Sequence, residues 1–249
     1  MNTKVIVCDL DGTLAPSKSA LEPSMAHIIC QVLKKHRFAI ISGGSHEQFI
    51  KQFLSHLVCE DRYLANLYLF PTNGSACYVF DYEHNLGWKK LYDEQLTVDE
   101  RKKIKDAFGR AIPASGVVTE EPFGEIVEDR GGQITFSGRG QEAPLDVKSV
   151  WDPDQTKRRK IVDLLKLEIP EFEIRMGGAT SIDVTHPGIT KAYAIGKIKE
   201  VLGVSTEDIV FIGDALYSGG NDESAKETGV ECVAVSGPTE TEKVLAIYI

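Results

Sequence analysis

Two aspartates stand at the end of a short hydrophobic run near the N-terminus. Asp9 and Asp11 follow Val5–Cys8, and Gly12-Thr13 then turns the chain away. Alternate residues of a strand point to opposite faces, but the chain leaves this rule at the strand's end, so both carboxylates can face one pocket. Such a pocket suits a hard cation and in-line phosphoryl transfer. We predict that Asp9 attacks phosphorus and that Asp11 handles the leaving-group proton.

Ser42 and Lys191 are a second set of candidates. Ser42 ends another buried run and is followed by Gly43 and Gly44. A small hydroxyl beside backbone N–H groups can hold a phosphoryl oxygen, although an ordinary strand-end turn has the same residues. Lys191 lies in the first turn of a predicted helix, where an ammonium can neutralise the transferring group. The alternative for Lys191 is a solvated helix lysine.

A third set of candidates follows the apolar run Ile209–Gly213. Asp214 comes directly after this run, and a glycine-rich loop then ends in Asn221-Asp222. An aspartate in a loop is usually a turn former, but two acids around paired glycines favour a functional site. Mg²⁺ prefers carboxylates, carbonyls, waters and phosphate oxygens. We therefore predict Asp214 as a direct ligand of Mg²⁺, and Asp222 as a ligand through water or a second acid.

These three sets of candidate residues resemble the motifs of the haloacid dehalogenase (HAD) superfamily of phosphotransferases and occur in the same order. The first motif is Asp9-Leu-Asp11-Gly-Thr. The resemblance implies that the side chains of Asp9 and Asp214 bind Mg²⁺, together with the backbone carbonyl of Asp11. It also implies an aspartyl-phosphate intermediate, with Ser42 and Lys191 stabilising the phosphoryl oxygens.

Further motifs resemble one branch of this superfamily, the eukaryotic-type phosphomannomutases. The loop from Gly213 to Asp222 has their length and ending, and Pro71-Thr-Asn-Gly74 has a counterpart in them. The stretch 177–184 is similar to the one by which those proteins hold the sugar phosphate, and the stretch 130–137 to their arginine-bearing cap strand. The resemblance implies a substrate-binding set of Gly43, Lys18, Arg130, Arg139, Ser181, Asp183 and Asn221.

The chain departs from those mutases at the positions that hold a second phosphate. Lys18 stands where they have an arginine. Arg130 matches the first of three cap arginines, Arg139 is near the second, and residues 146–148 contain no arginine for the third. Arginine binds phosphate bidentately, whereas lysine offers a point charge. The thinner clamp favours hydrolysis over mutase activity. The alternative for Arg130 and Arg139 is a solvated strand edge without a role in binding.

The elements predicted to position these residues form a discontinuous core. Strands and helices alternate first, as in a parallel sheet covered by helices, and this pattern stops near residue 83 and returns after Pro187. We predict an α/β fold: a HAD-like Rossmannoid parallel-sheet core over 1–82 and 187–249, with an α+β cap domain inserted over 83–186. Helices are expected over 22–36, 46–57, 96–112, 153–167, 190–202 and 223–228, and strands over 4–9, 38–42, 68–74, 124–129, 132–137, 172–175, 180–184, 207–213 and 231–236.

Composition restricts the partners and the compartment. The 249 residues carry a net charge of −9, which disfavours nucleic acid and anionic membranes. The five cysteines are scattered and odd in number, so we expect reduced, mostly buried thiols and a cytoplasmic protein. No apolar run approaches the roughly 20 residues of a membrane span, and Met1-Asn-Thr-Lys leads straight into a strand, so we expect no signal peptide.

Three functional hypotheses remain from the sequence. The preferred one is a Mg²⁺-dependent phosphohydrolase that acts through an aspartyl phosphate on a small phosphorylated metabolite of the sugar phosphate type. The alternative is a phosphomannomutase, which returns the phosphate to the sugar and must exclude water. The third is a catalytically weak metabolite-binding protein on the same scaffold. The resemblance to the mutases also implies a homodimer formed through the cap.

Overall fold

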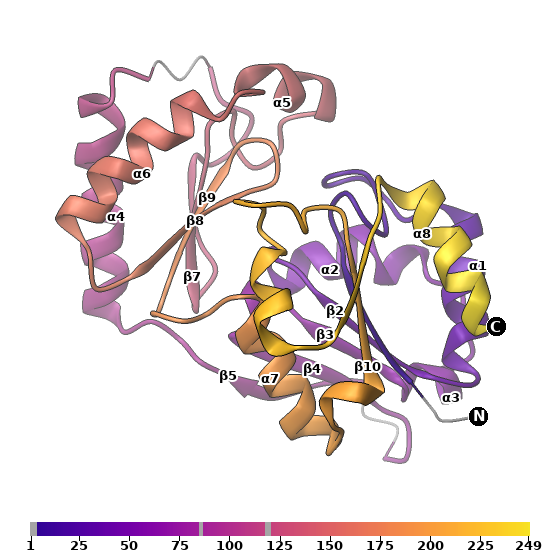
Figure 1. Cartoon of the computed structure of the whole chain (residues 1–249). Coiled ribbons are helices and arrows are strands. Elements are labelled where there is room, and N and C mark those ends of the chain that lie inside the picture. The colour runs from indigo at the N-terminus through magenta and orange to yellow at the C-terminus, as the bar shows by residue number, and fades with distance from the viewer. Residues whose placement is uncertain (1–3, 85–86, 118–120) are drawn as a thin grey trace. The chain divides into compact units, whose positions relative to one another are not determined.

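The structure, a computed structural model, describes residues 4–84, 87–117 and 121–249. These residues form two compact units (Figure 1). The first unit comprises the described residues up to Asp93 together with Thr190–Ile249, and the second those of Glu94–Ile189. The α/β fold class expected from the sequence is confirmed. Within the described ranges no helix has the length and apolar character needed to cross a membrane.

A seven-stranded sheet forms the centre of the first unit, in the order β11-β10-β1-β2-β3-β4-β5. The first five strands in this order are parallel. The chain moves outward from β1 in both directions, so the sheet has a switch point between β1 and β10, where open α/β sheets bind ligands beyond the carboxyl ends of the strands. The strands are β1 (Val5–Asp9), β2 (Arg37–Ile41), β3 (Leu67–Phe70), β4 (Ala76–Asp81), β5 (Gly87–Asp93), β10 (Ile209–Gly213) and β11 (Glu231–Ala234).

Helices cover both faces of this sheet because its central strands are apolar on both sides. In β1, Ile6 and Cys8 pack on the face covered by α1 (Pro23–Leu33), whereas Val5 and Val7 pack on the face covered by α7 (Lys191–Leu202). Figure 1 shows α8 (Pro238–Leu245) beside α1 and α7 on the opposite side of the sheet. The remaining helices of this unit are α2 (His46–Gln52) and α3 (Asp61–Leu64).

Four elements of the first unit differ from the expectation. Strands β4 and β5 were not anticipated and extend the sheet in antiparallel fashion, so residues 87–93, placed by the sequence in the insertion, belong to the core sheet. The C-terminal residues form α8, and its Leu245 is fully buried in the core. The helix expected over 46–57 ends at Gln52 and continues as a 3₁₀ turn over Leu54–His56.

The second unit is an antiparallel sheet backed by helices, in the order β6-β7-β9-β8. Ile134 and Phe136 of β7 point to the helix side and join a core with Ile104 and Phe108. The alternate residues of β7 are polar and equally buried, so the two faces of this sheet differ in chemistry. The elements are α4 (Val98–Ala114), β6 (Val127–Asp129), β7 (Gln133–Ser137), α5 (Leu145–Trp151), α6 (Thr156–Glu168), β8 (Glu173–Gly177) and β9 (Ser181–Thr185).

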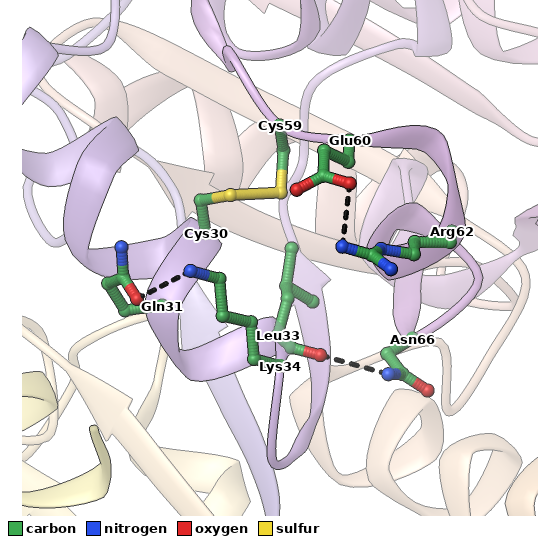
Figure 2. Close-up of a disulfide and its surroundings, with 8 residues drawn as sticks. All are labelled: Cys30, Gln31, Leu33, Lys34, Cys59, Glu60, Arg62 and Asn66. Carbon is green, nitrogen blue, oxygen red and sulfur yellow. Dashed lines mark hydrogen bonds and ion pairs between the residues drawn. A yellow bond between two sulfur atoms is a disulfide. The ribbon is translucent and has the colours of Figure 1, made fainter.

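The cysteines correct one expectation. Cys30 of α1 and Cys59 form a disulfide, with their Cα atoms 5.6 Å apart (Figure 2), so the expectation of five reduced thiols was wrong. Local spacing did not reveal the pair, because 29 residues separate the two cysteines and only tertiary packing brings them together. Asn66 adds a second link by donating to the carbonyl oxygen of Leu33, at 2.9 Å. Cys8, Cys77 and Cys232 are free thiols, the first two of them buried.

Candidate active site

Asp9 and Lys191 meet at the end of β1. Asp9 has the same strand parity as Val5 and Val7, so its side chain points to the face covered by α7. Lys191 is the first residue of α7, and its ammonium donates to Asp9 Oδ1 and, at 2.7 Å, to the carbonyl oxygen of Ile41. Only 2% of Asp9 and 1% of Lys191 are exposed. The sequence-predicted nucleophile and lysine therefore form a buried ion pair.

Asp222 is the second carboxylate beside Lys191. Its Oδ1 lies 3.5 Å from the ammonium, and its Oδ2 accepts from the N–H of Ala215, at 3.1 Å. A Cβ on Gly213 would come within 2.4 Å of Asp222 Oδ2. The last residue of β10 must therefore lack a side chain for Asp222 to fold back against the strand.

Asp214 is held by the first motif. The Thr13 hydroxyl donates to Asp214 Oδ1, at 3.0 Å, and accepts from the Asp214 N–H, also at 3.0 Å. Gly12 has a φ of +93°, and a Cβ there would lie 2.5 Å from Asp214 Oδ2. The Gly-Thr pair thus brings the loop after β1 against the loop after β10, a role for Thr13 that sequence reasoning missed.

Three carboxylates converge in a manner that suits a divalent cation. One oxygen each of Asp9, Asp214 and Asp222 lies within 4.8 Å of the others. Among the described residues, Asp9 Oδ2 and Asp222 Oδ1 are buried and make no hydrogen bond, although Asp222 Oδ1 is within ion-pair distance of the Lys191 ammonium. Buried carboxylate oxygens without donors are costly, and an all-oxygen set is the kind that Mg²⁺ prefers. The residues present therefore fit the ion implied by the sequence.

Burial governs the electrostatics of this cluster. Burial raises the pKa of the Asp9 carboxyl well above its ordinary value, and the charge of Lys191 offsets this only in part. Burial also raises the pKa of Asp214, and the charge of Asp222 adds to the effect. Burial opposes the charge on Lys191, but the carboxylates of Asp9 and Asp222 outweigh it and raise the pKa of the ammonium. Lys191 therefore stays charged, whereas the carboxylates gain from a further cation.

Asp11 lies outside this cluster of contacts and has partners of its own. Its carboxylate accepts from the backbone N–H of Lys18, from Gln48 Nε2 at 3.2 Å and from Gln52 Nε2 at 3.1 Å. Sequence reasoning missed both glutamines. The sequence does contain a signal for them, because Gln48 and Gln52 lie one helical turn apart directly after the glycine-rich loop.

The remaining predicted residues of the first unit lie on neighbouring loops. Ser42 follows β2, which pairs with β1 so that Ile41 is opposite Asp9. The Ser42 hydroxyl is buried and accepts from the N–H of Gly44, at 3.0 Å. Gly43 lies between these two residues, and Asn221 directly precedes Asp222. The backbone N–H of Lys18 donates to the Asp11 carboxylate, and Lys18 has a φ of +52°.

The predicted cap residues all lie in the second unit. Arg130 donates through Nε and Nη2 to Glu128, at 2.8 and 2.6 Å. Arg139 is 9% exposed and lies 5.9 Å from the centre of the Phe123 ring. Asp183 accepts from the Thr135 hydroxyl at 2.9 Å. Ser181 begins β9 on the same strand as Asp183.

Comparisons with known proteins identify the family and the fold. Residues 25–248 match the family described as eukaryotic phosphomannomutase. A probable phosphomannomutase of Caenorhabditis elegans is 24% identical over 247 residues, covering 96% of this chain and 92% of that protein. A 5-amino-6-(5-phospho-D-ribitylamino)uracil phosphatase of Bacillus subtilis is 26% identical, covering 100% of this chain and 90% of that protein. A solved haloacid dehalogenase-like hydrolase from Bacteroides thetaiotaomicron shares the fold, with a TM-score of 0.64, 13% identity and coverage of 99% and 100%.

Proposed function

Because the chain belongs to the eukaryotic phosphomannomutase family, we propose that it is a Mg²⁺-dependent phosphotransferase that acts as a phosphohydrolase on a sugar phosphate. The observation that carries the proposal is the buried cluster of Lys191 with three carboxylates. Two of these carboxylates have a buried oxygen that makes no hydrogen bond among the described residues. Asp9, Asp214 and Asp222 would hold Mg²⁺, together with the backbone carbonyl of Asp11. The ion supplies charge compensation for the transferring phosphoryl group.

The chain's own residues divide the reaction into two transfers. Asp9 attacks phosphorus, the bond to the leaving oxygen breaks, and Asp11 donates a proton to that oxygen. The deprotonated Asp11 then takes a proton from water, which attacks the aspartyl phosphate and releases phosphate and free Asp9. Lys191 neutralises the phosphoryl oxygens throughout, and the Ser42 hydroxyl can donate to one of them because it accepts from Gly44 and keeps its own proton.

The contacts of Arg130 favour hydrolysis over mutase activity. A mutase must bind the phosphate that is not being transferred. The Arg130 guanidinium is already paired with Glu128 through two of its nitrogens, and its side chain is only 5% exposed. An internal carboxylate competes with phosphate for this cation. Lys18 in place of an arginine further weakens the binding of a second phosphate, because a lysine offers a point charge instead of a bidentate contact.

A mutase remains the second candidate, because the matched family and the nematode relative have that name. It would use the same aspartyl phosphate, but the sugar instead of water would accept the phosphate. Arg130, Arg139, Ser181 and Asp183 would then hold the far end of a sugar bisphosphate. The two candidates share the chemistry of Asp9 and differ in their product.

Substitution of the nucleophile tests the shared chemistry. Asp9→Asn should reduce turnover at least about a thousandfold, because an amide oxygen is a poor nucleophile, and acid-quenched protein should no longer contain covalent phosphate. Asp61→Asn, an exposed aspartate of the same unit, is the matched control and should behave like the unaltered protein. Retained turnover or retained covalent phosphate in the Asp9 variant would overturn the assignment.

A further inference from the structure

We infer that Gln48 and Gln52 are positioning residues that fix the orientation of the Asp11 carboxylate during proton transfer. The inference rests on the proposed function, since it gives Asp11 the role of acid and base. Among the described residues, the side-chain amides of the two glutamines donate only to Asp11 and to each other, so both glutamines act through Asp11.

The two amides form a closed arrangement with the carboxylate. Gln48 Nε2 donates to Asp11 Oδ2 at 3.2 Å and to Gln52 Oε1 at 3.0 Å. Gln52 Nε2 donates to Asp11 Oδ1 at 3.1 Å. Each carboxylate oxygen therefore has an amide donor, and the bond between the glutamines fixes which end of the Gln52 amide faces Asp11. Two anchored oxygens prevent rotation of the carboxylate about its terminal torsion.

The helix behind the amides is itself held firmly. Ser45 caps the start of α2 by accepting from the N–H of Gln48, at 3.3 Å. Phe49 and Phe53 are completely buried below the helix. The carbonyl of Gln52 accepts from the N–H of Leu21, at 2.9 Å. A rigid helix with two side chains one turn apart is a suitable support for a catalytic carboxylate.

Two local features favour this arrangement of Gln48 and Gln52. A Cβ on Gly44 would lie 2.7 Å from Gln48 Oε1, so a residue with a side chain at position 44 would displace the Gln48 amide. Gln52 is only 4% exposed, and a buried amide destabilises the fold unless its hydrogen bonds are made. The Asp11 carboxylate and Gln48 provide those bonds.

The consequence of losing an amide depends on the leaving group. A sugar hydroxyl is a poor leaving group and needs the proton that Asp11 supplies, whereas p-nitrophenolate leaves without protonation. The constant kcat/KM reports the first phosphoryl transfer, in which this proton is given. A misplaced Asp11 therefore costs more with a sugar phosphate than with p-nitrophenyl phosphate, whereas general damage to the fold lowers both.

The experiment compares Gln48→Met and Gln52→Met with the unaltered protein, using p-nitrophenyl phosphate and the best substrate among mannose and glucose 1- and 6-phosphates. We expect kcat/KM for the sugar phosphate to fall roughly tenfold or more beyond the fall for the aryl phosphate. Gln31→Met is the matched control, because within the described part of the chain the Gln31 side chain makes one hydrogen bond, in which its Oε1 accepts from Lys34, and the substitution should change neither constant.

Equal losses on both substrates in both variants would overturn the inference and leave the amides a structural role only. Gln48 is only partly buried, so its variant keeps the test valid if the Gln52 variant fails to fold. An unaltered protein that turns over no sugar phosphate would instead overturn the proposed function, and the inference with it. A larger fall in kcat/KM for the sugar phosphate than for the aryl phosphate, in variants that unfold at the normal temperature, supports the inference.

Discussion

The ammonium of Lys191 compensates two buried carboxylates at once. It donates to Asp9 and lies 3.5 Å from Asp222, and none of the three side chains is more than 3% exposed. Such a group has two consequences. It stabilises the folded core in the absence of a cation, and it lowers the repulsion that an incoming phosphate would otherwise meet.

Replacement of this lysine should therefore affect stability as well as turnover. Lys191→Met keeps the volume of the side chain but leaves Asp9 and Asp222 without their counter-charge, which should cost about 3–5 kcal/mol of the free energy of unfolding. Urea unfolding measures the change. Added Mg²⁺ should restore part of the loss, because a cation at the carboxylates stabilises only the folded state.

A suitable control is Lys197→Met, in the same helix but with a side chain that is 26% exposed and pairs with the exposed Glu200. This variant should lose less than about 1 kcal/mol. Stability of the Lys191 variant equal to that of the unaltered protein, with or without Mg²⁺, would contradict the compensating role.

Residue types and their order were enough to predict most residues of the candidate site. Asp9, Lys191, Asp214 and Asp222 could be predicted because each lies at the end of an apolar strand or the start of a helix. The structure brings these four together. Gln48 could not be predicted, because its contact with Asp11 joins residues 37 positions apart and depends on how α2 packs on the sheet.

At the scale of elements, the disulfide joins α1 to the segment that follows α2. Cys30 lies in α1, and Cys59 lies between the 3₁₀ turn Leu54–His56 and α3. The loop it closes contains β2, the glycine-rich loop and α2, and so includes Ser42 and both positioning glutamines. Asn66 ties the end of α1 to the same region (Figure 2).

Reduction of this bond should lower stability. Closing a loop of this length removes about 3–4 kcal/mol of chain entropy from the unfolded state, so reductant should lower the Tm of the unaltered protein by roughly 10 °C. Cys30→Ser should show the lower Tm without reductant, and reductant should not lower it further. Differential scanning calorimetry checks both statements.

Cys232→Ser is the control for the disulfide experiment, because Cys232 is a free thiol of the same unit. Its Tm should still respond to reductant. A Tm of the unaltered protein that is the same with and without reductant, together with alkylation of Cys30 and Cys59 in the native protein without reductant, would show that the bond is not formed in solution.

Elements with strong local signals were predicted best. The buried runs of β1, β2 and β10 are continuous and apolar, and α4 and α7 have clear caps. In contrast, β4 and β5 are only half-buried, and their residues do not alternate cleanly because the strand pairing contains an irregularity between Cys77 and Tyr78. Tertiary pairing rather than local propensity fixes such strands.

At the scale of the whole molecule, the chain is a HAD-superfamily enzyme whose two units have different chemistry. The first unit contains the carboxylate cluster, and the second has a sheet with a buried polar face. The roles of catalytic core and substrate-selecting cap, and a homodimer through the cap, stay predictions. Family membership alone does not separate the two candidate activities, because the phosphatase from Bacillus subtilis is as similar to this chain as the mutases are.

The most direct test is an assay of the purified protein with Mg²⁺ and either mannose 1-phosphate or glucose 1-phosphate. The assay is run with and without the matching 1,6-bisphosphate, and free phosphate and hexose 6-phosphate are both measured. The pairing of Arg130 with Glu128 and the presence of Lys18 predict release of free phosphate without formation of 6-phosphate. Formation of 6-phosphate that is stimulated by the bisphosphate, with little free phosphate, would contradict the account and identify a mutase.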